Sequence, residues 1–215
     1  MLILSSCGFE SSELLPFCLD RLEEPPENVK ITVVLTAAIS FYEEVVVNDF
    51  CKYITALFNK SGIQEISFFD FAKDNPNYLF DSNIVLIMGG NPYYLLQQVK
   101  KSDSEEIIRK IALSNRIVIG VSAGAMMLSN GLVYFKDFLR INNDGFDDFG
   151  LEDLIGLQLA DHYIWPHFDV HLSEKPDLDD ELTKLEQELK IKVTRLNDSE
   201  NIVVENGKEA FVKFN

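Results

Sequence analysis

The sequence predicts an α/β fold, a three-layer α/β/α sandwich built on a mostly parallel, doubly wound sheet. Short apolar segments alternate with longer segments of helical period, and four of the short ones are nearly continuous apolar runs, which is typical of strands buried on both faces. The intervening segments are long enough for crossovers between parallel strands. The expected strands in this part are residues 2–4, 31–36, 65–69, 84–88 and 117–121.

Four helices are expected between and around these strands. The helix that precedes the strand at 117–121 has the clearest start, because Ser102 or Ser104 can cap it and Glu105 and Glu106 place negative charge in its first turn. The expected helices are residues 11–21, 41–60, 92–100 and 104–114.

The second half of the chain is less regular. A helix is expected directly after residue 122, ending near Gly131, and residues 136–155 are rich in Asp, Asn and Gly, which indicates a surface loop. Leucines at spacings of four, three and four predict an amphipathic helix over residues 175–190. The last expected strands are residues 191–195, 201–204 and 210–214.

Composition indicates one domain over residues 1–215, since the chain can form one substantial core and is short for two. The net charge of −16, from 35 acidic and 19 basic residues, would repel nucleic acid phosphates and anionic membrane surfaces, so neither is an expected partner. No apolar run approaches the roughly 18 to 20 residues that span a bilayer. A homodimer is left open.

The cysteines and the start of the chain indicate a reducing, cytoplasmic location. Cys7, Cys18 and Cys51 are odd in number and lack CxxC spacing, and nothing at the start resembles a secretory signal. We interpret all three as core residues.

A candidate nucleophile, Ser122, lies in the sequence Gly-Val-Ser-Ala-Gly-Ala at residues 120–125, directly after an apolar strand and before a helical segment. This is the G-x-S-x-G pattern in the strand, turn and helix context that a nucleophile elbow requires. The start of the helix would lie behind the hydroxyl, where its N–H groups favour developing negative charge. The alternative is an ordinary turn joining a strand to a helix.

A second glycine-rich turn, Gly89-Gly90-Asn91, follows the strand at 84–88. The carboxyl ends of parallel strands face one crevice in a doubly wound sheet, so this turn should lie near Ser122. The N–H groups of Gly90 and Ala123 could then form an oxyanion hole. An ordinary loop is the alternative interpretation.

The three histidines lie within ten residues, at positions 162, 167 and 171. A serine nucleophile needs a general base near neutral pH, and His167 is the candidate because bulky neighbours would fix its ring. A metal site that combines the histidines with Asp161 and Asp169 is a weaker alternative, because no H-E-x-x-H arrangement is present. We interpret the other two histidines as surface or hydrogen-bonding residues.

These motifs resemble the peptidase E and cyanophycinase family of serine peptidases, which has a class I glutamine amidotransferase-like fold. The resemblance rests on Gly89-Gly90-Asn91, on residues 120–125 and on Pro166-His167-Phe168, in that order. It implies cleavage of small peptides without metal or cofactor. By motif position it implies Ser122 as the nucleophile, His167 as the base, and an oxyanion and substrate site that includes Gly89, Gly90, Asn91 and Ala123.

The acid of the catalytic triad is open between two residues. Asp137 lies fifteen residues after the serine, as in relatives, and Asp198 replaces a glutamate that relatives carry after the Leu196 position. We favour Asp137 because its offset and residue type match the family.

Substrate and activity also have alternatives. Residues 169–180 are acidic where aspartyl dipeptidases carry arginines, which predicts that acidic N-terminal residues are not preferred. An α/β-hydrolase-like esterase would share the elbow, and a non-catalytic small-molecule-binding relative would share the fold.

Overall fold

A computed structural model describes residues 1–8, 13–142 and 148–214, with the side chains of residues 140–142 left out of the description. Its main sheet has seven strands in the order β3-β2-β4-β5-β1-β8-β9. These strands are β1 (Leu2–Ser5), β2 (Lys30–Val34), β3 (Glu65–Phe69), β4 (Ile84–Ile87), β5 (Ile117–Val121), β8 (Glu200–Glu205) and β9 (Lys208–Lys213).

The first five strands of the chain pair in parallel, and the last two are antiparallel. β8 pairs with β1, and a two-residue turn at Asn206 and Gly207, both with positive φ, leads into β9. The prediction of a mostly parallel α/β sheet is therefore confirmed, and all five early strands are confirmed with small changes at their ends.

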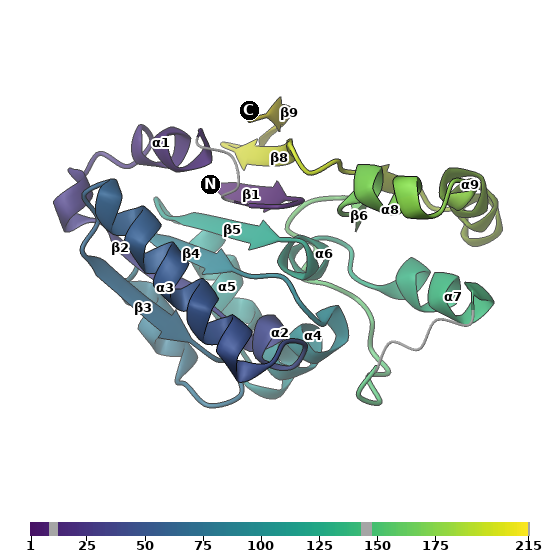
Figure 1. The fold of residues 1–215 in the computed structure, drawn as a ribbon, viewed down its shortest axis with the longest axis horizontal. Coiled ribbons are helices and arrows are strands. Elements are labelled where there is room, and N and C mark those ends of the chain that lie inside the picture. The colour runs from purple at the N-terminus through teal and green to yellow at the C-terminus, as the bar shows by residue number, and fades with distance from the viewer. Residues whose placement is uncertain (9–12, 143–147, 215) are drawn as a thin grey trace.

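Helices cover both faces of this sheet (Figure 1). One apolar cluster joins α1 and α3 to the sheet residues Ile3, Val33 and Ile119, and a second joins α4, α5 and α6 to Leu4 and Val118. Neighbouring residues of one strand are thus buried on opposite faces of the sheet, which explains why the strand sequences are continuous apolar runs. The helices of these layers are α1 (Leu14–Leu19), α2 (Thr36–Ile39), α3 (Glu44–Lys60), α4 (Pro92–Lys101), α5 (Glu105–Ala112) and α6 (Ala123–Leu128).

The four expected early helices are present, although α1 is shorter than residues 11–21, and residues 11 and 12 lie outside the described part of the chain. The expected amphipathic helix corresponds to α9 (Leu178–Leu189), whose Leu178, Leu182 and Leu185 are buried. In the described segments, no helix combines the length and the apolar character needed to cross a bilayer.

The prediction of a loop over residues 136–155 is wrong for its first part. α7 (Val133–Asn142) occupies it, and Tyr134 and Phe138, four residues apart, are buried on its inner face. The burial of these two aromatic side chains stabilises the helix by more than the low helix propensity of the local Asp and Asn residues destabilises it, because most helix stability in proteins comes from packing. Residues 143–147 lie outside the described part.

Two further elements were not expected. β6 (Tyr163–Trp165) pairs in parallel with β7 (Val193–Arg195) in a separate two-stranded sheet, so the expected strand at 191–195 forms but does not join the main sheet. α8 (Phe168–Glu174) follows β6 directly and begins next to His167.

Candidate active site

Ser122 lies in the sharp turn between β5 and α6. Its backbone has φ 51° and ψ −111°, a region that costs a non-glycine residue on the order of 1–3 kcal/mol. The surroundings hold this conformation, since the Ser122 N–H donates to the carbonyl of Ser5 at 2.9 Å at the end of the neighbouring strand β1. This is the conformation expected of a nucleophile elbow.

The small residues around the serine are required by close backbone contacts. A Cβ atom on Gly124 would lie 2.3 Å from the carbonyl oxygen of Ile87, at the end of β4. The helix that follows Ser122 therefore approaches the neighbouring strand more closely than any side chain permits. The G-x-S-x-G pattern is thus explained by packing as well as by chemistry.

The second glycine turn lies next to the serine, as the sequence predicts. A Cβ atom on Gly89 would lie 3.0 Å from Ser122 Cβ. Gly90 has φ +136°, and a Cβ atom there would lie 2.2 Å from the carbonyl oxygen of Ala37. Ala123 is the first residue of α6, where N–H groups have no acceptor within the helix.

Gly90→Ala is expected to lower the free energy of unfolding by about 3 kcal/mol, because strain at positive φ adds to a backbone clash. Gly207→Ala is the matched control: its φ is +71° but nothing lies within 4 Å of the added Cβ, so strain acts alone and about 1 kcal/mol is expected. Denaturant unfolding of both variants measures the difference. Equal losses would show that the contact with Ala37 is easily relieved.

Asn91 has a structural task at this turn. Its Oδ1 accepts hydrogen bonds from the N–H groups of Tyr93 and Tyr94 at 2.9 and 3.0 Å, and so caps α4. Its own N–H donates to the Ala37 carbonyl at 3.1 Å. The sequence suggests a substrate-binding role for Asn91, whereas these bonds indicate that it fixes the glycine turn.

His167 is held at the start of α8 in a left-handed conformation, with φ 53° and ψ 34°. Its Nδ1 atom lies 2.6 Å from Oδ1 of Asp198, a short charge-assisted hydrogen bond. The carbonyl of Leu196 accepts from the Phe168 N–H at 3.0 Å, which fixes the loop that carries the aspartate beside α8.

The geometry therefore favours Asp198 over Asp137 as the candidate acid. The described partner of His167 Nδ1 is Asp198, whereas Asp137 lies on α7. Burial raises the pKa of the Tyr93 hydroxyl, with smaller contributions from Asp148 and Asp137, so the Asp137 charge acts on the surroundings of Tyr93. The sequence prediction relied on the spacing of fifteen residues between Ser122 and Asp137, but the segment that carries Asp137 folds as a helix rather than as the expected loop.

Ser6 was not identified from the sequence. Its hydroxyl is buried, accepts from the His167 N–H at 2.7 Å and lies 3.1 Å from Oδ1 of Asp198, to which it can donate. It thus links the backbone of the histidine to the aspartate. A signal was present, because Ser5 ends the strand β1 and Ser6 and Cys7 follow it directly, at the same sheet edge as Ser122.

The other histidines make contacts elsewhere. Nδ1 of His162 lies 2.8 Å from Thr194 Oγ1, and its Nε2 lies 2.8 Å from Glu209 Oε1. Nδ1 of His171 accepts from Trp165 Nε1 at 2.9 Å, and burial, followed by the neighbouring His167, lowers the pKa of His171. Their interpretation as hydrogen-bonding residues agrees with these contacts.

One group of possible metal ligands is present among the described residues. The ligand atoms of Cys7, His167 and Asp198 lie within 4.8 Å of one another. An ion there would have to replace the hydrogen bond between the histidine and the aspartate. Cys7 therefore lies at the site rather than in the core, whereas Cys18 is buried as expected, and burial raises the pKa of its thiol to about 12.

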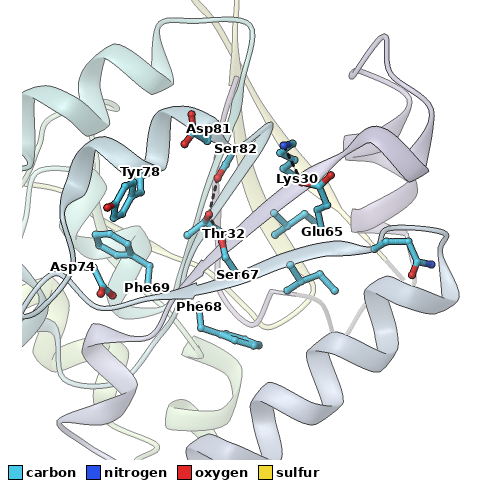
Figure 2. A pocket seen from close by; sticks show the side chains of 13 residues that line it. Lys30, Thr32, Glu65, Ser67, Phe68, Phe69, Asp74, Tyr78, Asp81 and Ser82 are labelled. Atoms are coloured by element: carbon cyan, nitrogen blue, oxygen red, sulfur yellow. Dashed lines mark hydrogen bonds and ion pairs between the residues drawn. The ribbon is translucent and has the colours of Figure 1, made fainter.

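A pocket of about 380 Å³ contains the reactive groups. Ser122, His167, Gly89 and Gly90 all line it. A larger hollow of about 550 Å³ runs along β2 and β3 (Figure 2), where the Thr32 hydroxyl lies within 2.8 Å of Ser67 and 2.6 Å of Ser82. That hollow contains no histidine or cysteine, so chemistry rather than size identifies the candidate active site.

The fold and this site define an α/β protein with a serine at a strained strand-to-helix elbow. The chain belongs to peptidase family S51, a serine peptidase family, whose model matches residues 1–212. This membership favours a peptidase over the esterase alternative.

Individual relatives agree with the family. The chain is 28% identical over 90 residues to the uncharacterized peptidase PM1590 of Pasteurella multocida, and the matched segment covers 42% of each chain. It is 25% identical over 91 residues to the uncharacterized peptidase Lmo0363 of Listeria monocytogenes, covering 40% of each. The matched segments thus span less than half the length of these curated relatives.

Two solved structures share the fold. A peptidase E protein from Listeria monocytogenes EGD-e superposes with a TM-score of 0.73 at 18% identity, covering 100% of this chain and 98% of that one. A peptidase from an acI-B1 Actinobacterium gives 0.68 at 18% identity, with 99% and 86% covered. At this identity the similarity shows the fold.

Proposed function

We propose that this protein is a serine exopeptidase that hydrolyses small peptides, with dipeptides among its substrates, through a triad of Ser122, His167 and Asp198. The observation that carries the proposal is the 2.6 Å contact between His167 and Asp198, at a pocket that His167 shares with the strained serine. Asp198 is half-buried, and a carboxylate hydrogen-bonded to Nδ1 is what orients a general-base histidine.

The reaction follows from the protonation states that this contact favours. With Nδ1–H donated to Asp198, the Nε2 lone pair accepts the hydroxyl proton of Ser122 as the oxygen attacks the peptide carbonyl. The N–H groups of Gly90 and Ala123 are proposed to stabilise the oxyanion. His167 then protonates the leaving amine, and water, deprotonated by the same nitrogen, releases the acid product and regenerates the serine.

The preference for short substrates rests on the size of the site. A pocket of about 380 Å³ lies at the low end of ligand-binding cavities, which commonly measure about 300–1,000 Å³. This volume matches the one or two residues of a short peptide that would lie next to Ser122.

Labelling with a fluorophosphonate probe and hydrolysis of a dipeptide panel test this function. The wild-type protein is expected to react stoichiometrically at Ser122 and to release amino acids from dipeptides, a reaction that an esterase does not catalyse. Absence of labelling together with absence of turnover would favour the non-catalytic binding alternative. Cleavage of p-nitrophenyl esters with no hydrolysis of any dipeptide would favour an esterase.

A further inference from the structure

The pocket beside Ser122 is walled by apolar side chains from the segment that follows β2. This segment runs from α2 into the first turns of α3, and the wall is completed at the ends of β4 and β5. The apolar lining residues include Ala38, Val46, Val47, Phe50, Met88 and Val121, with the ring of Tyr42 beside them.

This wall contains no Asp, Glu, Lys or Arg side chain among the residues that the structure describes. That is unusual for a chain with a net charge of −16, whose surface is rich in carboxylates. Tyr42 and Val46 are each 48% exposed, so apolar surface stays in contact with water at the mouth of the pocket. A substrate side chain that covered this surface would gain from the burial.

We propose that this pocket binds an uncharged, apolar side chain, preferably a large aliphatic or aromatic one, on the substrate residue that supplies the attacked carbonyl. The inference rests on the proposed function and adds the class of substrate. Gly90 belongs to the pocket wall and is the proposed oxyanion donor, so the residue that carries the carbonyl oxygen lies against this wall.

Charge discriminates against acidic side chains at this position. A carboxylate that enters the pocket loses hydration without gaining a cationic partner. Arg195 lies outside the pocket and pairs with Asp179 at 2.9 Å and Glu186 at 2.5 Å. The acidic stretch at 169–180 is thus partly neutralised, and the discrimination comes from the apolar wall instead.

The test uses two neighbouring valines of α3 as a matched pair. Val46 lines the pocket, whereas Val45 is 58% exposed and is not a lining residue. Both lie in the first turn of the helix, where an added Asp is tolerated. The variants are Val46→Asp, Val45→Asp and Val46→Lys, each assayed with X-Leu dipeptides in which X is Phe, Leu, Ala or Asp.

For the wild type we expect kcat/KM for Phe-Leu and Leu-Leu to exceed that for Ala-Leu by tenfold or more, since each buried methylene contributes about fourfold. Asp-Leu should be the poorest substrate.

Val46→Asp should lose most of the tenfold preference, and Val45→Asp should keep it. Val46→Lys should raise the relative rate for Asp-Leu. A preference for Asp-Leu in the wild type, or one expressed in the second residue of Ala-X peptides instead, would overturn the proposal.

A binding measurement separates this inference from the proposed function, because it needs no turnover. Calorimetric titration of Ser122→Ala with the same dipeptides should give the tightest binding for Phe-Leu, weakened by a further Val46→Asp change but not by Val45→Asp. That result supports the pocket assignment even if no peptide is hydrolysed. Tighter binding of Asp-Leu, or no measurable binding of any dipeptide, would refute it, whatever the labelling of Ser122 shows.

Discussion

Ser122→Ala is expected to lower kcat/KM for dipeptide hydrolysis on the order of 10³-fold or more. The variant removes the proposed attacking oxygen and leaves the elbow intact, because alanine keeps the Cβ atom and accepts the same backbone conformation, held by the hydrogen bond to Ser5. Thermal unfolding should therefore change by no more than a few degrees. Steady-state kinetics and fluorophosphonate labelling measure the loss.

Ser129→Ala is the control for this variant. Ser129 follows α6 at its other end, and its hydroxyl donates to the Met126 carbonyl at 3.0 Å. Its removal costs about 1 kcal/mol of stability at most and should leave kcat/KM within a few-fold. If Ser122→Ala kept activity within a few-fold of the wild type, the serine mechanism would be wrong.

The strands and the elbow could be predicted because their causes are local. A strand buried on both faces needs apolar residues at every position, as in Ile84–Ile87, and the close approach of α6 to β4 needs glycine at position 124. Both requirements act within a few consecutive residues. Such patterns are visible without knowledge of the fold.

The carboxylate beside His167 and the hydroxyl that supports this histidine could not be predicted in the same way, because they depend on contacts between distant segments. Asp198 is 31 residues from His167, and Ser6 is 161 residues away, directly after the first strand. Their meeting depends on β8 returning antiparallel beside β1, which brings the loop at Asp198 to the carboxyl end of the parallel strands. The number of residues between Ser122 and a candidate acid does not indicate that β8 pairs with β1.

The apolar pocket wall was also not identifiable from the sequence. Val47, Ile54 and Phe58 are the buried residues of α3 and follow an ordinary helical period. Val46 and Phe50 lie within one helical turn of Val47, so the helical pattern assigns them to the edge of the apolar face. Both residues line the pocket that contains Ser122. This arrangement depends on the close contact between the glycine turn at Gly90 and the backbone at Ala37, which the sequence does not indicate.

Asp198→Asn is expected to lower kcat between about 10²-fold and 10⁴-fold, with a smaller change in KM. The carboxylate lies at hydrogen-bond distance from His167 Nδ1, and in the proposed mechanism it stabilises the imidazolium that forms as the serine loses its proton. An amide has no charge to stabilise that cation, and its NH₂ group can donate to Nδ1, which would place the ring proton on Nε2 and block the base. The loss thus has two causes that act on the same nitrogen.

Asp137→Asn is the matched comparison, since it makes the same chemical change at the acid that the sequence favours. Asp137 lies on α7, and its charge acts on the surroundings of Tyr93, so we expect kcat within a few-fold of the wild type. Ser6→Ala should lie between the two variants, because it removes a hydroxyl that Asp198 can accept from and leaves the His167 N–H without its acceptor. Kinetics of the three variants, with thermal unfolding to exclude misfolding, decide the assignment. A large loss for Asp137→Asn with near-normal Asp198→Asn would mean that the acid acts from α7, and that the short contact at His167 serves the fold rather than the reaction.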